Sequence, residues 1–412
     1  MNDRRYRVLA VASHPVQYMS PVLRRLSQDP HVDLKVAYCS LRGAEAMHDP
    51  EFNTTVKWDV PLLDGYSWVE VNNRGSGRES FFGLCNPGLW KEIRKGKYDA
   101  VLCYLGYVRA SFWISYMAGK FMARTAFVFG TDASSLVSRS ASRWKFWLKK
   151  ACWPFLFSLA DQVIVPSSPT RDLMLSLGLP SQLLTLTPYS VDNEWWLARS
   201  AEIDRDAIRA SWGANQQTRV ILFCAKLQPW KRPMDVLEAF EGLSADELSR
   251  ALLVYAGEGN QRAELVARAE SLGVGGKVRF LGFVNQSELP GVYRSADLMV
   301  LPSEYEPFAV VVNEASCCGC PVAVSDRVGA GRDLVKPANP DLIFPCGDTG
   351  ALKKILKSCV TEPEKFKMAG GLAKQRMEMW SLRENIAGHV EAIERAVASV
   401  EGNRIVEQQR AG

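Results

Sequence analysis

Short apolar runs alternate with helix-length segments throughout this chain of 412 residues, and this alternation limits the possible folds more than any other feature. Such runs are typical of buried parallel strands, which are covered on both faces and joined by crossover helices. The pattern therefore predicts an α/β fold of two Rossmann-like, doubly wound domains that face each other across a cleft. The runs lie at residues 7–12, 34–38, 100–104, 125–129 and 162–165, then at 220–224, 251–255, 278–281, 298–301 and 322–324.

The break between the two sets of strands places the domain boundary. We predict an N-terminal domain over residues 1–195, a C-terminal domain over 196–380 and a terminal helical segment over 381–412. The connection lies near residues 188–215, where a turn-rich segment precedes a charged helical stretch.

The composition is that of an ordinary globular protein, with 47% hydrophobic and 23% charged residues. A net charge of +5 is small for this length, so we expect no nucleic-acid partner. The charge is still compatible with an anionic ligand or an anionic membrane surface. No apolar run reaches the roughly 18 residues that span a bilayer, and no signal-peptide core follows the N-terminus. We therefore expect a cytoplasmic protein.

Ten cysteines are scattered through apolar contexts and predict reduced, buried thiols. The cluster of Cys317, Cys318 and Cys320 resembles a metal motif at first sight. No complementary Cys/His cluster accompanies it, so packing is the favoured interpretation.

The segment from residue 298 to 326 has the pattern of a strand, a loop, a helix and a further strand. Backbone N–H groups at the start of this helix, where residues 308–310 lie, are predicted to bind a phosphate or diphosphate through Phe308, Ala309 and Val310. Glu306 precedes the helix and Glu314 lies inside it. Eight helical positions span roughly 12 Å, about the distance from a sugar across a diphosphate to a ribose. Alone, two such glutamates also fit a solvated helix face.

With Pro302-Ser303 before it and Gly319-x-Pro321-Val322 after it, this segment resembles the donor signature of glycosyltransferase family 4, the retaining nucleotide-sugar enzymes of GT-B fold. The resemblance implies a hexosyltransferase-type enzyme that transfers a sugar from a nucleotide diphosphate sugar to a carbohydrate or glycolipid acceptor with retention. It implies an acceptor-binding N-terminal domain, a donor-binding C-terminal domain and a terminal helix that crosses back to the former. Surface polysaccharide or glycolipid biosynthesis is the expected setting.

Two lysines follow the first strand of the C-terminal domain. Lys226 and Lys231 resemble the basic pair that contacts the donor diphosphate in this family, and such cations stabilise charge on a leaving group. The alternative is a solvated basic turn. Arg232 is either a third contact or solvent-facing.

Two further segments resemble donor-site elements of the family. Gly257 and Gly259 flank an acidic residue in a turn beside the expected pocket, where close backbone approach favours glycine. Phe283 and Val284 occupy the segment whose backbone is expected to read the nucleotide base.

The N-terminal half departs from the family pattern. His14 ends the first strand, where the resemblance would place it in the cleft, and it either contacts a ligand or serves a structural role such as capping. The histidine that follows the fourth strand in well-known members is missing, and Asp132 or Thr131 takes its position.

No metal and no cofactor are expected, because the donor is itself a substrate. A metal-dependent enzyme of the GT-A type would need an Asp-x-Asp at a strand end. The one such triplet, Asp204-Arg-Asp206, opens a helix and is interpreted as N-terminal capping.

Residues 143–153 combine aromatic and basic side chains. At helical spacing, one face would pack on the sheet through Trp144, Trp147, Leu148 and Ala151. Phe146 and Trp153 then lie between cations and are expected either to contact the anionic inner face of the cytoplasmic membrane or to be covered by another helix.

Two alternatives to a glycosyltransferase stay open. One is a GT-B nucleotide-sugar epimerase, which the combination of lysines and glutamates disfavours. The other is a catalytically silent nucleotide-sugar-binding or scaffolding subunit, which the missing histidine leaves possible. Donor turnover, compared with donor binding, separates them.

Overall fold

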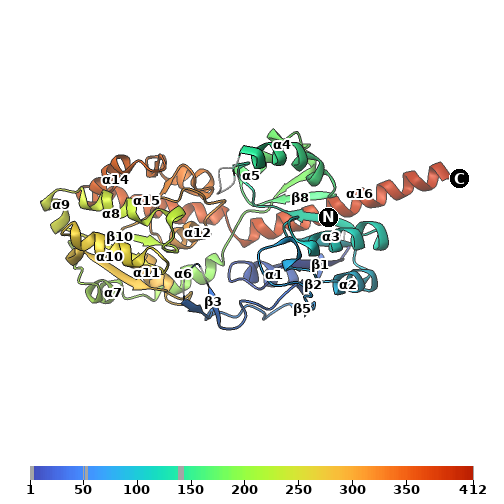
Figure 1. The fold of residues 1–412 in the computed structure, drawn as a ribbon, viewed down its shortest axis with the longest axis horizontal. Coiled ribbons are helices and arrows are strands. Elements are labelled where there is room, and N and C mark those ends of the chain that lie inside the picture. The colour runs from blue at the N-terminus through green and yellow to red at the C-terminus, as the bar shows by residue number, and fades with distance from the viewer. Residues whose placement is uncertain (1–3, 50, 52–53, 138–142, 412) are drawn as a thin grey trace. The chain divides into compact units, whose positions relative to one another are not determined.

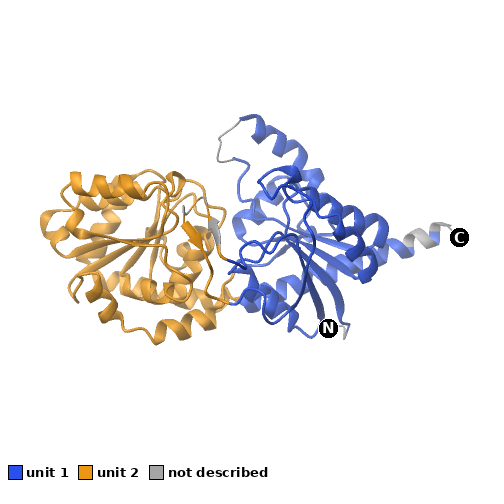
Figure 2. Cartoon of the chain, turned by 60° about the horizontal axis from the view of Figure 1, so that its bottom comes forward, with its two compact units in different colours: residues 1–45, 61–189, 382–412 blue, residues 46–60, 190–381 orange. Residues whose placement is uncertain are grey.

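The structure is a computed structural model that describes residues 4–49, 51, 54–137 and 143–411. The chain divides into two compact units (Figure 2). Unit 1 comprises residues 1–45, 61–189 and 382–412, and unit 2 comprises residues 46–60 and 190–381. A short early segment therefore belongs to the same unit as the second half of the chain.

Unit 1 contains a parallel sheet of seven strands in the order β5-β2-β1-β6-β7-β8-β9. Of these strands, β1, β2, β5 and β8 are labelled in Figure 1. The five strands predicted in the first half are present, and the short strands β5 and β9 extend the two edges. The strands are β1 (Tyr6–Ala12), β2 (Val32–Tyr38), β5 (Ser67–Glu70), β6 (Ala100–Cys103), β7 (Ala126–Gly130), β8 (Gln162–Val165) and β9 (Leu184–Leu186).

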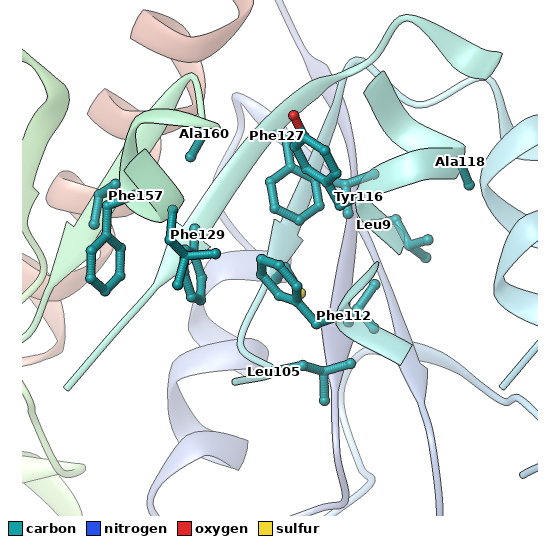
Figure 3. Close-up of a cluster of buried hydrophobic side chains, with 14 of the residues drawn as sticks. Leu9, Leu105, Phe112, Tyr116, Ala118, Phe127, Phe129, Phe157 and Ala160 are labelled. Carbon is teal, nitrogen blue, oxygen red and sulfur yellow. The ribbon is translucent and has the colours of Figure 1, made fainter. Parts of the chain in front are cut away.

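Helices cover both faces of this sheet, as the continuous apolar strands require. An aromatic cluster on one face includes Phe112, Phe127 and Phe129, which lie close together in Figure 3. On the other face α1 and the long C-terminal helix α16 supply the covering side chains. The helices of unit 1 are α1 (Met19–Ser27), α2 (Gly88–Gly96), α3 (Ala110–Met117), α4 (Arg143–Ser158), α5 (Ser168–Ser176) and α16 (Leu382–Ala411).

Helix α16 is an integral part of unit 1. Its buried residues include Ile386, Ile393 and Val397, which pack with strand residues in the core. Gly388 lets the helix approach β9, because an added Cβ would lie 2.2 Å from the carbonyl oxygen of Leu186. Loss of α16 would expose that face of the sheet, and each fully buried aliphatic side chain contributes about 1.5–3 kcal/mol.

Helix α4 presents the opposite face to solvent from the one predicted. Trp153 is 5% exposed and donates a hydrogen bond from Nε1 to the Tyr107 hydroxyl at 2.8 Å, so the expectation that it is available to a membrane is wrong. Trp144 (65% exposed), Trp147 (61%) and Phe155 (71%) lie in solvent instead, so the predicted packing of the first two on the sheet is also wrong. The cause is that Trp153, Leu156 and Phe157 fill the sheet-facing side of the helix.

Unit 2 contains a parallel sheet of six strands in the order β12-β11-β10-β13-β14-β15. The strand order reverses between β10 and β13, and ligands of doubly wound folds bind at the carboxyl ends of the strands beside such a reversal. The two sheets confirm the predicted pair of Rossmann-like units. The strands are β10 (Arg219–Cys224), β11 (Ala251–Ala256), β12 (Val278–Gly282), β13 (Leu298–Leu301), β14 (Val322–Ser325) and β15 (Ile343–Phe344).

The remaining elements of unit 2 are its helices and one hairpin. Asp204 caps α7 by accepting a hydrogen bond from the Ala207 amide at 3.0 Å, which confirms its predicted capping role. The hairpin joins β3 (Met47–Asp49) to β4 (Thr54–Val56). The helices are α6 (Asn193–Ala201), α7 (Arg205–Ser211), α8 (Pro233–Glu241), α9 (Ala245–Ser249), α10 (Arg262–Ser271), α11 (Leu289–Ser295), α12 (Val310–Cys317), α13 (Lys336–Ala338), α14 (Thr349–Thr361) and α15 (Pro363–Arg376).

Candidate active site

The loops at the carboxyl ends of β10, β11, β12 and β13 carry the predicted donor-site residues of unit 2. Gly257 and Gly259 follow β11, and both have positive φ. An added Cβ would lie 2.0 Å from the Ala225 carbonyl oxygen at Gly257 and 2.4 Å from the Leu227 carbonyl oxygen at Gly259. These glycines therefore let the loop after β11 pack directly against the loop that carries Lys226.

Lys231 and Glu306 form an ion pair inside unit 2. The Lys231 ammonium group donates a hydrogen bond to a Glu306 carboxylate oxygen, and both side chains are largely shielded from solvent. Their positions lie 75 residues apart in the chain. The fold thus brings one predicted diphosphate contact and one predicted sugar contact together at the start of α12.

The turn after β14 fixes the backbone around Glu306. The Gly329 amide donates to the Glu306 carbonyl oxygen at 3.0 Å, and the Ala330 amide donates to the Phe308 carbonyl oxygen at 2.9 Å. An added Cβ at Gly329 would lie 1.9 Å from the Pro307 carbonyl oxygen. This close approach explains why glycine stands at that position.

Helix α12 begins immediately after a strained residue. Ala309 has φ +87°, which is unfavourable for a residue with a Cβ and costs on the order of 1–3 kcal/mol. Phe308 beside it is buried and stacks on Trp380, with ring centroids 6.3 Å apart. The packing of Phe308 therefore helps to hold the first turn of α12, including Val310, in place.

Glu314 lies in the second turn of α12 and is buried. It accepts a hydrogen bond from the Tyr293 hydroxyl at 2.8 Å, and that hydroxyl also lies 3.4 Å from the Cys224 sulfur. Burial raises the pKa of Glu314 to about 7, although hydrogen bonds from Tyr293 and Gln286 act in the opposite direction. Glu314 therefore titrates near neutral pH.

Glu314→Gln is expected to flatten the dependence of stability on pH. In the unfolded chain the carboxyl group ionises near its ordinary pKa of 4.5, whereas the folded protein keeps the proton to about pH 7. The folded state binds more protons between these values, so the unfolding free energy of the parent falls as pH rises, by about 3 kcal/mol. Denaturant unfolding from pH 4.5 to 8 measures this slope, and equal slopes in parent and variant would contradict the assignment.

Among the described residues, Asp49 and Glu51 contact Lys226, and the sequence did not predict these contacts. The Lys226 ammonium group lies 2.8 Å from a Glu51 oxygen and 3.1 Å from an Asp49 oxygen. Both acids come from residues 46–60 of unit 2. The same segment places Trp58 against Phe283, with ring centroids 5.9 Å apart. Val284, which directly follows Phe283 in the chain, is half-buried.

The two other predicted site residues belong to unit 1. His14 is exposed, and its Nδ1 lies 3.0 Å from the Ser13 hydroxyl. Asp132 is exposed after β7. Burial, with a smaller contribution from the Asp132 charge, raises the pKa of Tyr18 to about 12.

Within the described residues, no group of three or more His, Cys, Asp or Glu side chains is placed to hold a metal ion. Cys317, Cys318 and Cys320 are buried free thiols. Burial raises the pKa of the Cys318 thiol to about 12. These cysteines pack around the end of α12, in keeping with the interpretation from their spacing.

The fold is that of the GT-B glycosyltransferases, as known structures show. Anabaena HepE in complex with UDP and glucose aligns with a TM-score of 0.68 at 17% identity, covering 92% of this chain and 97% of that chain. A glycosyltransferase from Rickettsia africae aligns with a TM-score of 0.70 at 15% identity, covering 95% and 99%.

Residues 204–376 match the family described as "Glycosyl transferases group 1". D-inositol 3-phosphate glycosyltransferase from Rhodococcus opacus is 31% identical over 209 residues, which are 49% of this chain and 47% of the relative. GDP-mannose-dependent alpha-mannosyltransferase from Mycobacterium tuberculosis is 26% identical over 255 residues, or 59% and 61% of the two chains. The chain thus spans about half the length of the curated relatives it matches. The resemblance inferred from the motifs is confirmed.

Proposed function

We propose that the protein transfers a hexosyl group from a nucleoside diphosphate sugar to an acceptor hydroxyl, with retention, in surface polysaccharide or glycolipid biosynthesis. The observation that carries the proposal is the Lys231–Glu306 pair at the start of α12. It lies where the reversal of strand order in unit 2 favours a ligand. The names of the relatives, which refer to glycosyl and mannosyl transfer, support the same class of reaction.

The proposed reaction depends on stabilising the negative charge that develops on the leaving diphosphate. When the bond between the sugar and the diphosphate breaks, its electron pair stays with the diphosphate oxygen. The acceptor oxygen forms the new bond to the sugar, and its proton passes to the departing diphosphate. Lys226, Lys231 and the N-terminal amides of α12 offset the growing negative charge. In this scheme Glu306 accepts hydrogen bonds from sugar hydroxyls. No cofactor is needed in this scheme.

Ligand screening followed by turnover tests the proposal. A thermal-shift panel of UDP-, GDP-, ADP- and TDP-sugars identifies the donor, because a ligand at 100 times its dissociation constant stabilises by about 2.7 kcal/mol. Release of nucleoside diphosphate only when an acceptor is present indicates transfer. Donor binding without turnover would indicate the scaffolding alternative, and conversion to an isomeric nucleotide sugar would indicate an epimerase.

Turnover is expected to persist in excess chelator. Two lysines and a helix terminus are available for the charge of the leaving diphosphate, which is the role that a divalent cation plays in metal-dependent transferases. The measurement is the initial rate with EDTA, compared with rates after adding magnesium or manganese. Complete loss of activity in chelator, restored by either metal, would contradict this expectation.

A second proposal is peripheral association with an anionic membrane through α4. Trp144, Trp147 and Phe155 are exposed on this helix, and Lys145, Lys149 and Lys150 lie among them. Exposed aromatic side chains framed by cations match the charge and polarity of an anionic lipid surface. None of the described helices is long and apolar enough to cross a bilayer.

Replacing Trp147 and Phe155 with serine is expected to weaken binding to vesicles of anionic lipid at least tenfold, because both side chains would lose their apolar contact with the interface. Sedimentation with vesicles measures the effect. Phe82→Ser is a matched control, since Phe82 is 68% exposed elsewhere on unit 1. Equal binding by the double variant and the parent, or no binding by the parent, would contradict the proposal.

A further inference from the structure

A segment from the first half of the chain lies on the candidate donor site of unit 2. We call its described residues, 46–49, 51 and 54–60, the strap. Its two strands pair antiparallel, with Asp49 opposite Thr54, and Val56 is buried. The chain enters the strap from unit 1 at Glu45 and returns to unit 1 at Pro61.

The acidic end of the strap neutralises a lysine of the site. Asp49 and Glu51 both contact the Lys226 ammonium group, and the Gln228 side chain donates a hydrogen bond to the Glu51 carbonyl oxygen. The strap thus brings carboxylates to the position where the proposed function places a diphosphate. The pairs are partly open to water, with side-chain exposures of 25% for Lys226, 27% for Asp49 and 43% for Glu51, and such pairs are weak enough to exchange.

The other end of the strap covers the segment expected to read the base. Asn285 donates from Nδ2 to the Lys57 carbonyl oxygen at 2.7 Å. The Ser287 amide donates to Asp59 at 3.2 Å, and the Ser287 hydroxyl donates to the same carboxylate. Trp58 packs against Phe283 beside these bonds. The strap therefore contacts both the diphosphate lysine and the base segment.

We propose that the strap is an internal competitor of the donor. Its carboxylates at Asp49 and Glu51 hold Lys226 in place of the diphosphate, and the donor binds with full affinity only after the strap leaves. This inference rests on the proposed function. When only a fraction of the protein is competent to bind, the apparent affinity for the ligand falls in proportion to that fraction. A strap that stays in place about nine-tenths of the time would therefore lower the affinity for the donor about tenfold.

The competing explanation is that the strap always stays in place as part of the binding site. Its acids would then orient Lys226. The two explanations predict opposite effects of removing the acids. If the strap is a fixed part of the site, removing the acids frees the Lys226 side chain from its position, and a diphosphate then binds less tightly. If the strap is a competitor, removing the acids leaves Lys226 available, and a diphosphate then binds more tightly.

The test is the affinity of the full chain for UDP, GDP, ADP and TDP, measured by calorimetry on the parent and on D49N/E51Q. We expect the double variant to bind the preferred nucleoside diphosphate about tenfold more tightly. D341N/E364Q removes the same charge from exposed positions of unit 2 and should match the parent. Asp59→Asn keeps both acids on Lys226 but loosens the opposite end, and a gain of about threefold is expected.

Hydrogen exchange supplies a second readout. In the parent, the nucleoside diphosphate should speed exchange of the β4 amides, Thr54–Val56, because the strap leaves its place. Unchanged or weaker affinity in D49N/E51Q, or slower β4 exchange with ligand, would overturn the inference while leaving the donor site intact. Failure of all four nucleoside diphosphates to bind either protein would contradict the donor site itself, and the inference with it.

Discussion

Glu306→Gln is expected to lower kcat by about 100- to 1,000-fold while leaving affinity for the nucleoside diphosphate within about threefold of the parent, or tighter. The amide keeps the shape of the side chain but cannot accept sugar hydroxyl hydrogens as strongly as a carboxylate. Affinity for the diphosphate does not fall, because Glu306 is bonded to Lys231 in this structure and its neutralisation frees that lysine. Steady-state kinetics and calorimetry measure the two quantities.

The neighbouring Glu304 provides the control. It lies two positions earlier in the same loop, its side chain is 61% exposed, and its carboxylate lies 4.0 Å from the Arg232 guanidinium group. Glu304→Gln removes the same charge without touching the Lys231 pair and should leave kcat unchanged. If Glu306→Gln instead lost nucleotide affinity and kept its turnover, the proposed orientation of the donor would be reversed.

The strands were predictable because their burial has a simple pattern in sequence. Runs such as 220–224 are apolar at every position, since helices cover both faces of a parallel sheet. The edge strands β5 and β9 lacked this signal. Ser67–Glu70 is mostly exposed, and β9 has only three residues, so neither gives a continuous apolar run.

Helix α4 shows what helical periodicity leaves undetermined. The spacing of Trp144, Trp147 and Phe155 reveals that they share a face, and the spacing of Trp153 and Phe157 defines another. Both faces carry aromatic side chains, so apolar content does not identify the one that meets the sheet. Tyr107, which contacts Trp153, and Phe129, which stacks on Phe157, decide it, and both lie in other parts of the chain.

The sequence predicted which loop residues belong to the candidate site, but it did not predict the side chains that they contact. The glycine turn after β11, the lysines after β10 and Glu306 all follow strands, as their motifs indicated. The partners of Lys226 lie about 175 positions earlier, in a hairpin with strands of three residues and no periodic pattern. Likewise, spacing placed Glu314 on α12, while its hydrogen-bond partner Tyr293 lies on α11.

Lys231→Ala is expected to damage both nucleotide binding and turnover. The variant loses a charge-assisted contact worth about 1.5–3 kcal/mol, which corresponds to roughly 10- to 150-fold in the dissociation constant of the nucleoside diphosphate. It also leaves the Glu306 carboxylate largely shielded and without its cation, where it repels a diphosphate. Because negative charge grows on the leaving group, kcat should fall by a further factor of about 100.

A double-mutant cycle separates the two causes. If repulsion by the unpaired Glu306 contributes, K231A/E306Q should bind the nucleoside diphosphate more tightly than K231A, although its turnover stays low. Lys367→Ala removes an exposed cation from α15 and should match the parent in both measurements. Parent-like affinity and turnover in K231A would refute the role of the lysine. If Glu306→Gln changed the affinity by the same factor in the parent and in K231A, the ion pair in the free protein would have no influence on donor binding.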